Sequence, residues 1–301
     1  MVDDVPILEV SGLAKEFATR HDPRGSKAEG EVRSGLLGRR LGSASKRTVS
    51  AVEDVSFCVA PGESLAIVGE SGSGKTTVAR MIIGLETPTG GRIVVAGRER
   101  SGHRVNSRER KRRAREVQIV FQDPYLSLDP RMTIHACIAE VLRLHFDLSE
   151  NERNDRIAQL LDQVGLDQRH QEVLPRSLSG GQRQRVAIAR ALASEPLLLI
   201  CDEAVASLDV SIQAQVLNLL SDIREQTGVS YLFISHDLAV VRQVSDRVVV
   251  MKSGRIVESG PTDTVLHSPQ EAYTRRLLLA IPREGWHPME DADVTDDVEG
   301  L

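Results

Sequence analysis

The sequence lacks any regular arrangement of cysteine. Its three cysteines, Cys58, Cys137 and Cys201, are far apart and form no CxxC motif. This scatter argues against a disulfide framework and against a metal site built from cysteine thiolates. We therefore expect the chain to reside in a reducing compartment.

Long hydrophobic runs are also missing. Apolar runs such as PLLLIC at 196–201 are far shorter than the roughly 20 residues that a membrane-spanning helix needs. The first ten residues, MVDDVPILEV, are acidic and lack the basic and apolar regions of a secretory signal. We expect neither a signal peptide nor a membrane span, so that any role at a membrane would act through a partner.

Excess positive charge is absent as well. The formal net charge is −5, so the chain has no global attraction to nucleic acid. One basic run, RERKRRAR at 108–115, has no aromatic residues within it, and we interpret it as a solvated helix face rather than a nucleic-acid patch. The sequence MEDADVTDDVEGL at 289–301 has no basic residue and predicts a disordered acidic tail.

What the sequence does contain is an alternation of strand and helix patterns. The apolar runs PLLLIC and SYLFIS predict strands buried on both faces, RVVVM and GRIVES two further strands, and 211–228 a helix. Helical signals also fill about 124–174. This alternation predicts an α/β fold with a mainly parallel sheet. Residues 20–48, rich in glycine, serine and charge, predict a long surface loop within an N-terminal β-region.

A glycine-rich loop supplies the first chemical signal. The sequence GESGSGKT at 69–76 matches the phosphate-binding pattern GxxxxGK[ST] and lies between a predicted strand and helix. Lys75 is expected to reach the β- and γ-phosphates of a nucleotide, and Thr76 to offer its hydroxyl to Mg²⁺. A chance glycine turn is the alternative. The predicted phosphate contacts are Gly69, Glu70, Ser71, Gly72, Ser73, Gly74, Lys75, Thr76 and Thr77.

Two acids follow the predicted strand LLLIC. Ligands of open α/β sheets gather at the carboxyl ends of the strands, where Asp202 and Glu203 are expected to lie. Neighbouring residues of a strand point to opposite sides, so the two acids have different expected roles. Asp202 would hold Mg²⁺, and Glu203 would orient and polarise an attacking water. A helix cap or a solvated turn is the alternative for such an acidic pair.

Two further polar residues follow predicted strands. His236 ends LFISH and is a candidate contact to the γ-phosphate and the water, although a lone histidine is more often structural. Gln122 ends the β-rich run VQIVFQ, and its amide is a candidate ligand of Mg²⁺ or the water. Both residues would share the sheet edge of the two acids.

Six motifs in order resemble those of the ATP-binding subunits of ABC transporters: GESGSGKTT, FQDP, LSGGQRQRVAIARAL, LLLICDE, ASLD and ISHD. The resemblance implies ATP and Mg²⁺ as cofactors. It also implies a P-loop NTPase fold, with a RecA-like core, a β-subdomain and a helical signature subdomain at about 123–190. The implied nucleotide-binding domain spans 1–262, and an extension with a disordered tail spans 263–301.

The resemblance places further residues around the nucleotide. Phe17 lies where the family has an aromatic that stacks on adenine; an ordinary core phenylalanine is the alternative. Family members close head to tail, so that one chain's signature motif faces the ATP of the other. The start of the helix after LSGGQ offers N–H donors and a positive dipole end to that γ-phosphate. The residues implied at the partner's nucleotide are Ser179, Gly180, Gly181, Gln182 and Asp209.

Segments between the motifs resemble one branch of the family, the peptide and nickel importers. They include FQDPYLSLDPRMTI, LDVSIQAQVLNLL and SPQEAYTRRLLLAIP, and GLLGRR suggests the second, F-type, of the two ATPases in such systems. The implied cargo is di- or oligopeptides. The implied partners are a second ATPase subunit, favoured to be a different chain although a homodimer remains open, two membrane permeases and, indirectly, an extracytoplasmic solute-binding protein. The implied location is the cytoplasmic face of the membrane.

Rival interpretations stay open. The same motor would serve nickel, opines or another small solute. A soluble ABC ATPase of DNA repair or translation is less favoured, because the sequence has neither a long coiled-coil insertion nor a second cassette. A P-loop kinase would leave LSGGQ without a role.

Three departures from the family pattern stand out. Ala204 replaces the usual proline after the acid, which frees one backbone φ angle, and we predict only a modest effect. EAYT at 271–274 replaces the branch's usual HPYT and weakens the peptide assignment. No cysteine follows Cys201, so we predict that the iron–sulfur cluster of some branch members is absent.

Overall fold

The computed structural model describes residues 5–19, 47–100, 105–123 and 127–279. The acidic tail predicted at 289–301 lies outside the described residues, and so does most of the surface loop predicted at 20–48. That loop was predicted slightly too long, because strand β2 already begins at Arg47.

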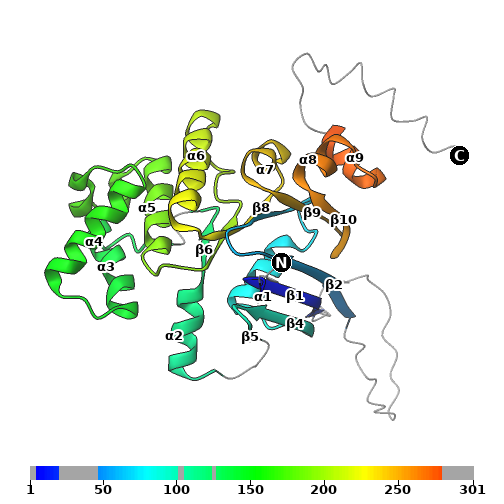
Figure 1. Ribbon diagram of the computed structural model, residues 1–301, viewed down its shortest axis with the longest axis horizontal. Coiled ribbons are helices and arrows are strands. Elements are labelled where there is room, and N and C mark those ends of the chain that lie inside the picture. The colour runs from blue at the N-terminus through cyan, green and yellow to red at the C-terminus, as the bar shows by residue number, and fades with distance from the viewer. Residues whose placement is uncertain (1–4, 20–46, 101–104, 124–126, 280–301) are drawn as a thin grey trace, which may run out of the picture.

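A six-stranded sheet forms the centre of the molecule (Figure 1), in the order β10-β9-β3-β8-β7-β6. All neighbouring strands in it are parallel except β9 and β10, which form an antiparallel pair at one edge. The predicted α/β fold with a mainly parallel sheet is therefore confirmed. The strands are β3 Ser64–Val68, β6 Val117–Phe121, β7 Leu198–Asp202, β8 Ser230–Ser235, β9 Arg247–Lys252 and β10 Arg255–Pro261.

A second, four-stranded sheet is antiparallel and has the order β2-β1-β4-β5. It contains the N-terminal β-region that the sequence predicts. Its long strands β1 and β2 are paired along most of their length, with irregularities in register after Val10, Leu13 and Lys15. The strands are β1 Leu8–Thr19, β2 Arg47–Val59, β4 Gly90–Val95 and β5 Arg98–Glu99.

Nine helices occur among the described residues and flank these sheets. Helices α3, α4 and α5 form a separate lobe, drawn in green at the left of Figure 1. None of the described helices is long and apolar enough to cross a membrane. The helices are α1 Lys75–Ile83, α2 Ser107–Glu116, α3 Ile134–His145, α4 Glu150–Gln163, α5 Gly180–Leu192, α6 Val210–Thr227, α7 Leu238–Val244, α8 Thr262–His267 and α9 Ala272–Leu279.

The parallel sheet separates two hydrophobic cores. In β3, Leu65 and Ile67 pack into a core shared with the antiparallel sheet and α1, whereas Ala66 and Val68 pack into a core shared with the helices of the other face. The other parallel strands alternate in the same way. This arrangement explains why the strands read as unbroken apolar runs, because both faces of each strand are buried.

The helical lobe is built by local signals that the sequence displays. Thr133 caps α3, and Ser149 with Glu152 forms a capping box at the start of α4. Ile157 and Leu160 of α4, which recur at helical spacing, are fully buried against the neighbouring helices. The lobe follows β6 in the chain and returns to the sheet through α5, which packs on α3, α4 and β6.

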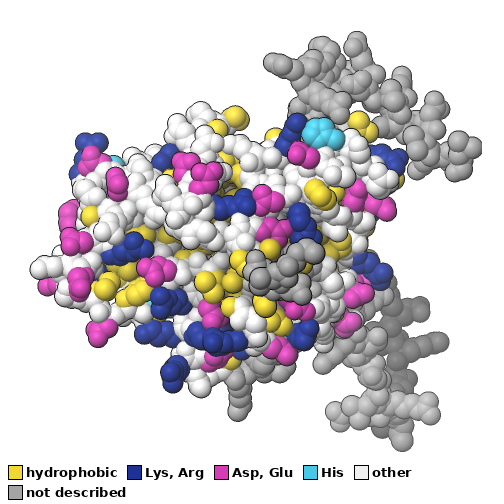
Figure 2. Space-filling model, in the orientation of Figure 1, with side chains coloured by type: hydrophobic (Ala, Val, Ile, Leu, Met, Phe, Trp, Pro, Cys, Tyr) yellow, Lys and Arg dark blue, Asp and Glu magenta, His cyan; other side chains and the backbone are white. Residues whose placement is uncertain are grey.

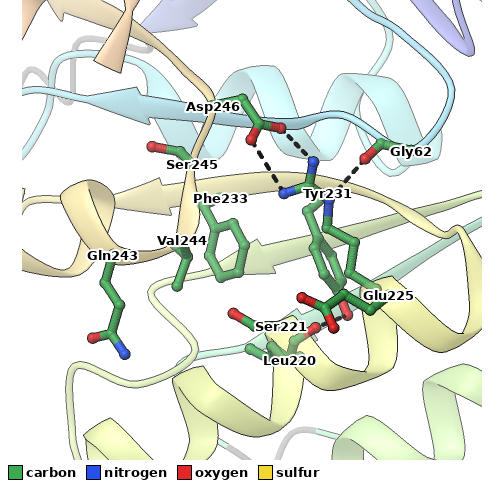
Figure 3. Close-up of a pocket in the computed structure, with 11 residues that line it drawn as sticks. Gly62, Leu220, Ser221, Glu225, Tyr231, Phe233, Gln243, Val244, Ser245 and Asp246 are labelled. Carbon is green, nitrogen blue, oxygen red and sulfur yellow. Dashed lines mark hydrogen bonds and ion pairs between the residues drawn. The ribbon is translucent and has the colours of Figure 1, made fainter. Parts of the chain in front are cut away.

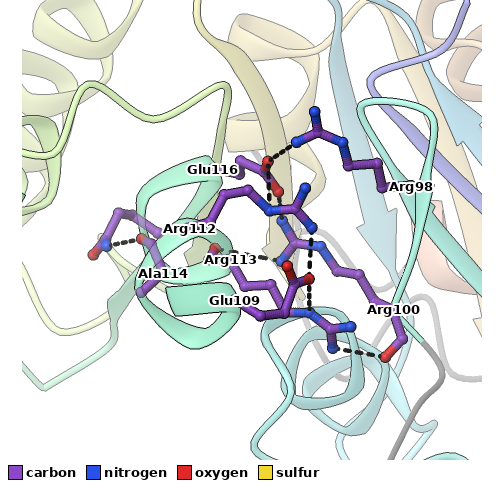
Figure 4. Close-up of polar contacts among 8 residues, drawn as sticks. Arg98, Arg100, Glu109, Arg112, Arg113, Ala114 and Glu116 are labelled. Carbon is purple, nitrogen blue, oxygen red and sulfur yellow. Dashed lines mark hydrogen bonds and ion pairs between the residues drawn. The ribbon is translucent and has the colours of Figure 1, made fainter. Parts of the chain in front are cut away.

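The basic run at 108–115 forms α2 and is only partly a solvated face. Arg112 and Arg113 are half-buried and pair with Glu109, with Arg113 Nε 2.8 Å from Glu109 Oε1 (Figure 4). Glu116, at the end of α2, pairs with the buried Arg100 at 2.7 Å. The Glu116–Arg100 pair and a hydrogen bond from Arg113 to the carbonyl of Arg100 tie α2 to the segment that follows β5, so part of the basic run has a structural role that its composition does not predict.

Candidate functional site

The loop between β3 and α1 has the backbone shape that the phosphate-binding pattern requires. Gly69, Gly72 and Gly74 have φ angles of 150°, 82° and 104°. A Cβ atom at Gly74 would lie 2.5 Å from the carbonyl oxygen of Ala51, so no larger residue fits there. The loop leads directly into α1, whose first-turn N–H groups and dipole favour an anion at this end of the helix.

Lys75 lies inside this loop. Its Nζ donates hydrogen bonds to the carbonyl oxygens of Gly69, at 2.7 Å, and Glu70, at 2.8 Å. Burial lowers the pKa of the Lys75 ammonium, while the carboxylates of Glu203, Asp202 and Glu70 act in the opposite direction. The ammonium is thus held by the loop carbonyls beside acidic groups, in the position from which a lysine can bind phosphate oxygens.

Asp202 meets Thr76 at the start of α1. The Thr76 hydroxyl donates to Asp202 Oδ1 at 3.2 Å, although the two residues belong to different elements. Asp202 is the last residue of β7 and is buried, and this burial raises the pKa of its carboxyl, whereas the bond from Thr76 lowers it. The structure therefore brings together Thr76 and Asp202, two of the three residues that the sequence assigns to Mg²⁺, the third being Gln122.

These two donors fit Mg²⁺ chemically. Hard oxygen ligands suit this ion, which is typically held by one or two carboxylates together with substrate phosphates and water. Within the described residues, no group of three or more His, Cys, Asp or Glu side chains could hold a metal alone. A site completed by phosphate oxygens agrees with that donor set.

Glu203 and His236 come together at the next position along the same edge. Glu203 Oε1 lies 3.2 Å from His236 Nδ1, and the two residues follow the adjacent parallel strands β7 and β8. A small cavity of about 70 Å³ borders both residues, which is space enough for water. An acid, an imidazole and room for water are the components that activation of a water molecule needs.

The backbone of Glu203 is unusual. Its φ angle is +51°, a left-handed value that a non-glycine residue rarely adopts. Its N–H donates to the carbonyl of Ile234 at 2.9 Å, and its own carbonyl accepts from the N–H of Ala206 at 3.0 Å. Both main-chain groups of the acid are thus hydrogen-bonded although the following residue is Ala204, and the modest effect of the missing proline stays a prediction.

Both Gln122 and Phe17 have exposed side chains. Gln122 follows β6, whose last residue pairs in register with Asp202, and is exposed. Phe17 is 39% exposed, so the core alternative is wrong. Its strand partner is Val49, which is 54% exposed and lies two residues before Ala51, the residue that contacts the phosphate loop. An exposed apolar pair beside the loop is suited to a flat base.

The signature motif begins α5 with a capping box. Ser179 Oγ accepts from the N–H of Gln182 at 3.2 Å, and Gln182 Oε1 accepts from the N–H of Ser179 at 2.9 Å. A Cβ atom at Gly181 would overlap Cγ2 of Ile212 in α6, so the glycine permits the close approach of the two helices. Asp209 caps α6, and its pKa is lowered by the bond it accepts from the N–H of Ile212. Both helix starts are thus fixed in orientation.

Two residues near the site carry no signal in the sequence. The hydroxyl of Tyr273 accepts the N–H of Glu70 at 3.1 Å, and Ser207 Oγ donates to the carbonyl of Gln122 at 3.3 Å. Tyr273 lies in EAYT, a segment that the sequence relates only to the peptide and nickel importer branch and not to the nucleotide site. No spacing in the sequence links position 70 to 273 or 122 to 207.

A larger cavity lies elsewhere. It measures about 470 Å³ and is lined by the Tyr231 and Phe233 rings, Leu220 and Asp246 (Figure 3). Tyr231 is near the start of β8 and Asp246 precedes β9, so this cavity is at the amino edge of the parallel sheet. The residues predicted to bind phosphate and magnesium occupy the opposite, carboxyl edge.

Comparisons with known proteins agree with this geometry. A sequence profile of the family described as "ABC transporter" matches residues 52–206. The glutathione import ATP-binding protein GsiA of Escherichia coli O6:H1 is 46% identical over 285 residues, which cover 94% of this chain and 42% of the relative. GsiA of Pectobacterium atrosepticum is 46% identical over 277 residues, covering 92% of this chain and 41% of the relative. The chain thus spans about two-fifths of the length of these curated relatives.

Solved structures share the fold. A dimeric ATP-binding cassette in a post-hydrolysis state, bound to ADP and Pi, matches with a TM-score of 0.68 and 26% identity, covering 85% of this chain and 98% of that one. CbiO1 of Clostridium perfringens, part of an ABC transporter complex, matches with a TM-score of 0.69 and 25% identity, covering 92% and 96%. The chain therefore belongs to the ABC transporter family.

Proposed function

We propose that this chain is the ATP-hydrolysing subunit of an importer for di- or oligopeptides. The observation that carries the hydrolytic part is the meeting of two pairs at one sheet edge, Thr76 with Asp202 and Glu203 with His236. The first pair lies at the start of the phosphate-loop helix. The second borders a small cavity that has space for water.

In this proposal the chain binds and orients the triphosphate. The N–H groups of the glycine loop and Lys75 hold the β- and γ-phosphates, and Thr76 and Asp202 hold Mg²⁺, which neutralises phosphate charge when bound. Phe17 packs on the adenine. Phosphoryl transfer needs positioning and charge stabilisation above all, and a loop held in place by glycine packing provides both.

Glu203 acts on the attacking water. Its carboxylate accepts a proton from the water as the water oxygen bonds to the γ-phosphorus and the bond from that phosphorus to the ADP oxygen breaks. His236 keeps the Glu203 side chain and the γ-phosphate in place through its ring nitrogens. Gln122, at the same edge, contributes its amide to the metal or the water.

A second cassette completes each site. The capped start of α5 presents Ser179, Gly180, Gly181 and Gln182, and with Asp209 these residues contact the nucleotide bound by the other chain. ATP favours the closed pair because only that state makes these contacts, and hydrolysis releases it. The second cassette is a related ATPase chain, and a second copy of this chain is the alternative.

The names of the relatives support a peptide cargo. Proteins that share 46% identity with this chain are named for the import of glutathione, a small peptide. We infer that this chain lies at the cytoplasmic face of a membrane, bound to two permeases, and that a solute-binding protein outside delivers the peptide. The same motor driving nickel, an opine or another small solute is the second candidate. A soluble ATPase of DNA repair or translation is the third.

Co-purification tests these alternatives. The tagged chain, expressed in its natural cell, should be recovered with two multi-span membrane proteins, and the reconstituted complex should hydrolyse ATP faster with peptide-loaded binding protein. Stimulation by nickel or an opine but not by peptide would select the second candidate. Recovery of the chain without any membrane protein would select the third.

A further inference from the structure

The phosphate loop is held from outside by a side chain of the last described helix. Tyr273 of α9 is buried, and its hydroxyl accepts the N–H of Glu70 at 3.1 Å across 203 residues of sequence. The hydroxyl thus reaches the main chain of the loop at its second residue.

The bonded N–H belongs to the same peptide group as the carbonyl of Gly69. That carbonyl accepts a hydrogen bond from Lys75 Nζ at 2.7 Å. The C=O and N–H of a trans peptide point in opposite directions, so Lys75 and Tyr273 hold this one group from its two ends. The orientation of the carbonyl that binds the ammonium therefore depends on the bond made by the hydroxyl.

Tyr273 is itself well supported. The Lys252 ammonium lies 4.9 Å from the centre of its ring, and the carboxylate of Glu258 in β10 accepts the N–H groups of Gln270 and Glu271 just before α9 begins. These contacts fix the ring and the start of its helix against the edge of the parallel sheet. Because the ring is fixed, the Tyr273 hydroxyl can keep the N–H of Glu70 in place.

The loop also rests on the turn that follows β9. The N–H of Gly254 donates to the carbonyl of Ser73 at 3.0 Å, and a Cβ atom at Gly69 would overlap the carbonyl oxygen of Met251. The glycine that brings the loop close to β9 is thus the residue whose peptide is bonded by Tyr273. The outer side of the loop forms a continuous contact with the C-terminal part of the chain.

We propose that Tyr273 is a positioning residue for nucleotide binding, which orients the Gly69–Glu70 peptide and through it the ammonium of Lys75. The inference rests on the proposed ATP site. Helix α9, which carries Tyr273, is then part of the ATP-binding site, and a displacement of α9 changes the affinity for ATP.

The test is Tyr273→Phe, which removes only the hydroxyl and keeps the ring against Lys252. Its matched control is Tyr231→Phe, because Tyr231 is also buried and its hydroxyl donates to a backbone atom, the carbonyl of Leu220 at 2.9 Å, far from the phosphate loop. The dissociation constant of a fluorescent ATP analogue and the thermal midpoint are measured for the wild-type chain and both variants.

We expect Tyr273→Phe to bind ATP about three- to tenfold more weakly, as the loss of one hydrogen bond predicts, and Tyr231→Phe to bind like wild type. In steady-state hydrolysis KM should rise by the same factor, with kcat changed less than about twofold. Hydrogen exchange of the peptide that contains residues 64–74 should be faster only in Tyr273→Phe.

A second variant loosens the support of α9 and keeps the Tyr273 hydroxyl. Glu258→Met removes the acceptors of the N–H groups of Gln270 and Glu271, and it should weaken ATP binding in the same direction but less. Unchanged ATP affinity in Tyr273→Phe, or a loss that the Tyr231→Phe control shares, would overturn the role of Tyr273 alone. A wild-type chain that binds no ATP would overturn the proposed function and this role together.

Discussion

Glu203 and His236, 33 residues apart in the sequence, meet through Oε1 and Nδ1 at 3.2 Å. We predict that Glu203→Gln lowers the rate of ATP hydrolysis at least about 100-fold, because the amide cannot accept the proton of the water. ATP binding should remain within about threefold of wild type, since the phosphate loop is untouched. Phosphate release and nucleotide titration measure the two quantities. Hydrolysis near the wild-type rate would remove Glu203 from the role of base.

We predict that Asp202→Asn raises the stability of the chain at neutral pH while it lowers the rate of ATP hydrolysis. Burial raises the pKa of the Asp202 carboxyl, so the folded chain holds the carboxylate less favourably than the unfolded chain does. Below the pKa of the unfolded chain, Asp202 is protonated in both states and the variant should match wild type. As the pH rises through the raised folded pKa, wild type loses stability that the variant keeps.

The stability gain of Asp202→Asn over wild type should therefore grow with rising pH and level off above the raised folded pKa, as thermal midpoints at several pH values would show. Magnesium-dependent hydrolysis should fall sharply at every pH. Asp209→Asn is the control of opposite sign, because the pKa of Asp209 is lowered by bonds to the start of α6. A stability gain for Asp202→Asn that is equal at pH 3 and pH 8 would contradict the effect of burial.

Gly181→Ala should destabilise the contact between α5 and α6. The added Cβ would overlap Ile212, and relief of this overlap requires the helices to move apart, at about 1–3 kcal/mol. The neighbouring Gly180→Ala is the control, since its Cβ would lie 3.8 Å from Leu208 Cδ2, an ordinary contact. Chemical denaturation of the two variants should differ by this amount, and equal stabilities would show that α6 yields without cost.

Ser179→Arg tests which nucleotide the signature motif serves. In the isolated chain the variant should bind ATP like wild type, with about 1 kcal/mol lost from stability because the cap of α5 is gone. ATP-dependent pairing of cassettes, followed by size-exclusion chromatography in the Glu203→Gln background, should disappear. Loss of ATP binding by the isolated chain would instead assign the motif to its own site.

The parallel sheet and its carboxyl edge could be predicted because they rest on local patterns. Unbroken apolar runs give strands buried on both faces, and each run that ends in a polar residue delivers it to the same edge. Asp202, Glu203 and His236 follow from this rule, together with the glycine loop. The sequence predicts only in part which acid contacts which partner, because the order of the strands in the sheet determines which strand ends are neighbours.

Other features have no local signal. The positive φ angle of Glu203 could not be predicted, because glutamate rarely adopts such a value. In the structure it accompanies the hydrogen bond from the N–H of Glu203 to the carbonyl of Ile234 in the neighbouring strand. Tyr273 reaches Glu70 only because α9 folds back on the sheet. In the basic run of α2, the composition predicts that Arg112 and Arg113 are solvated. In the structure both residues pair with Glu109 of the same helix.

The hydrogen bond from Ser207 to the carbonyl of Gln122 joins two loops that face different neighbours in the proposed complex. Gln122 begins the segment that leads to the helical lobe, and Ser207 lies two residues before Asp209, which caps α6. A displacement of the loop at Gln122 would therefore act on the loop at Ser207 through this one hydrogen bond. Movement of a membrane subunit bound beside Gln122 would then reach the surface that meets the other cassette through this hydrogen bond.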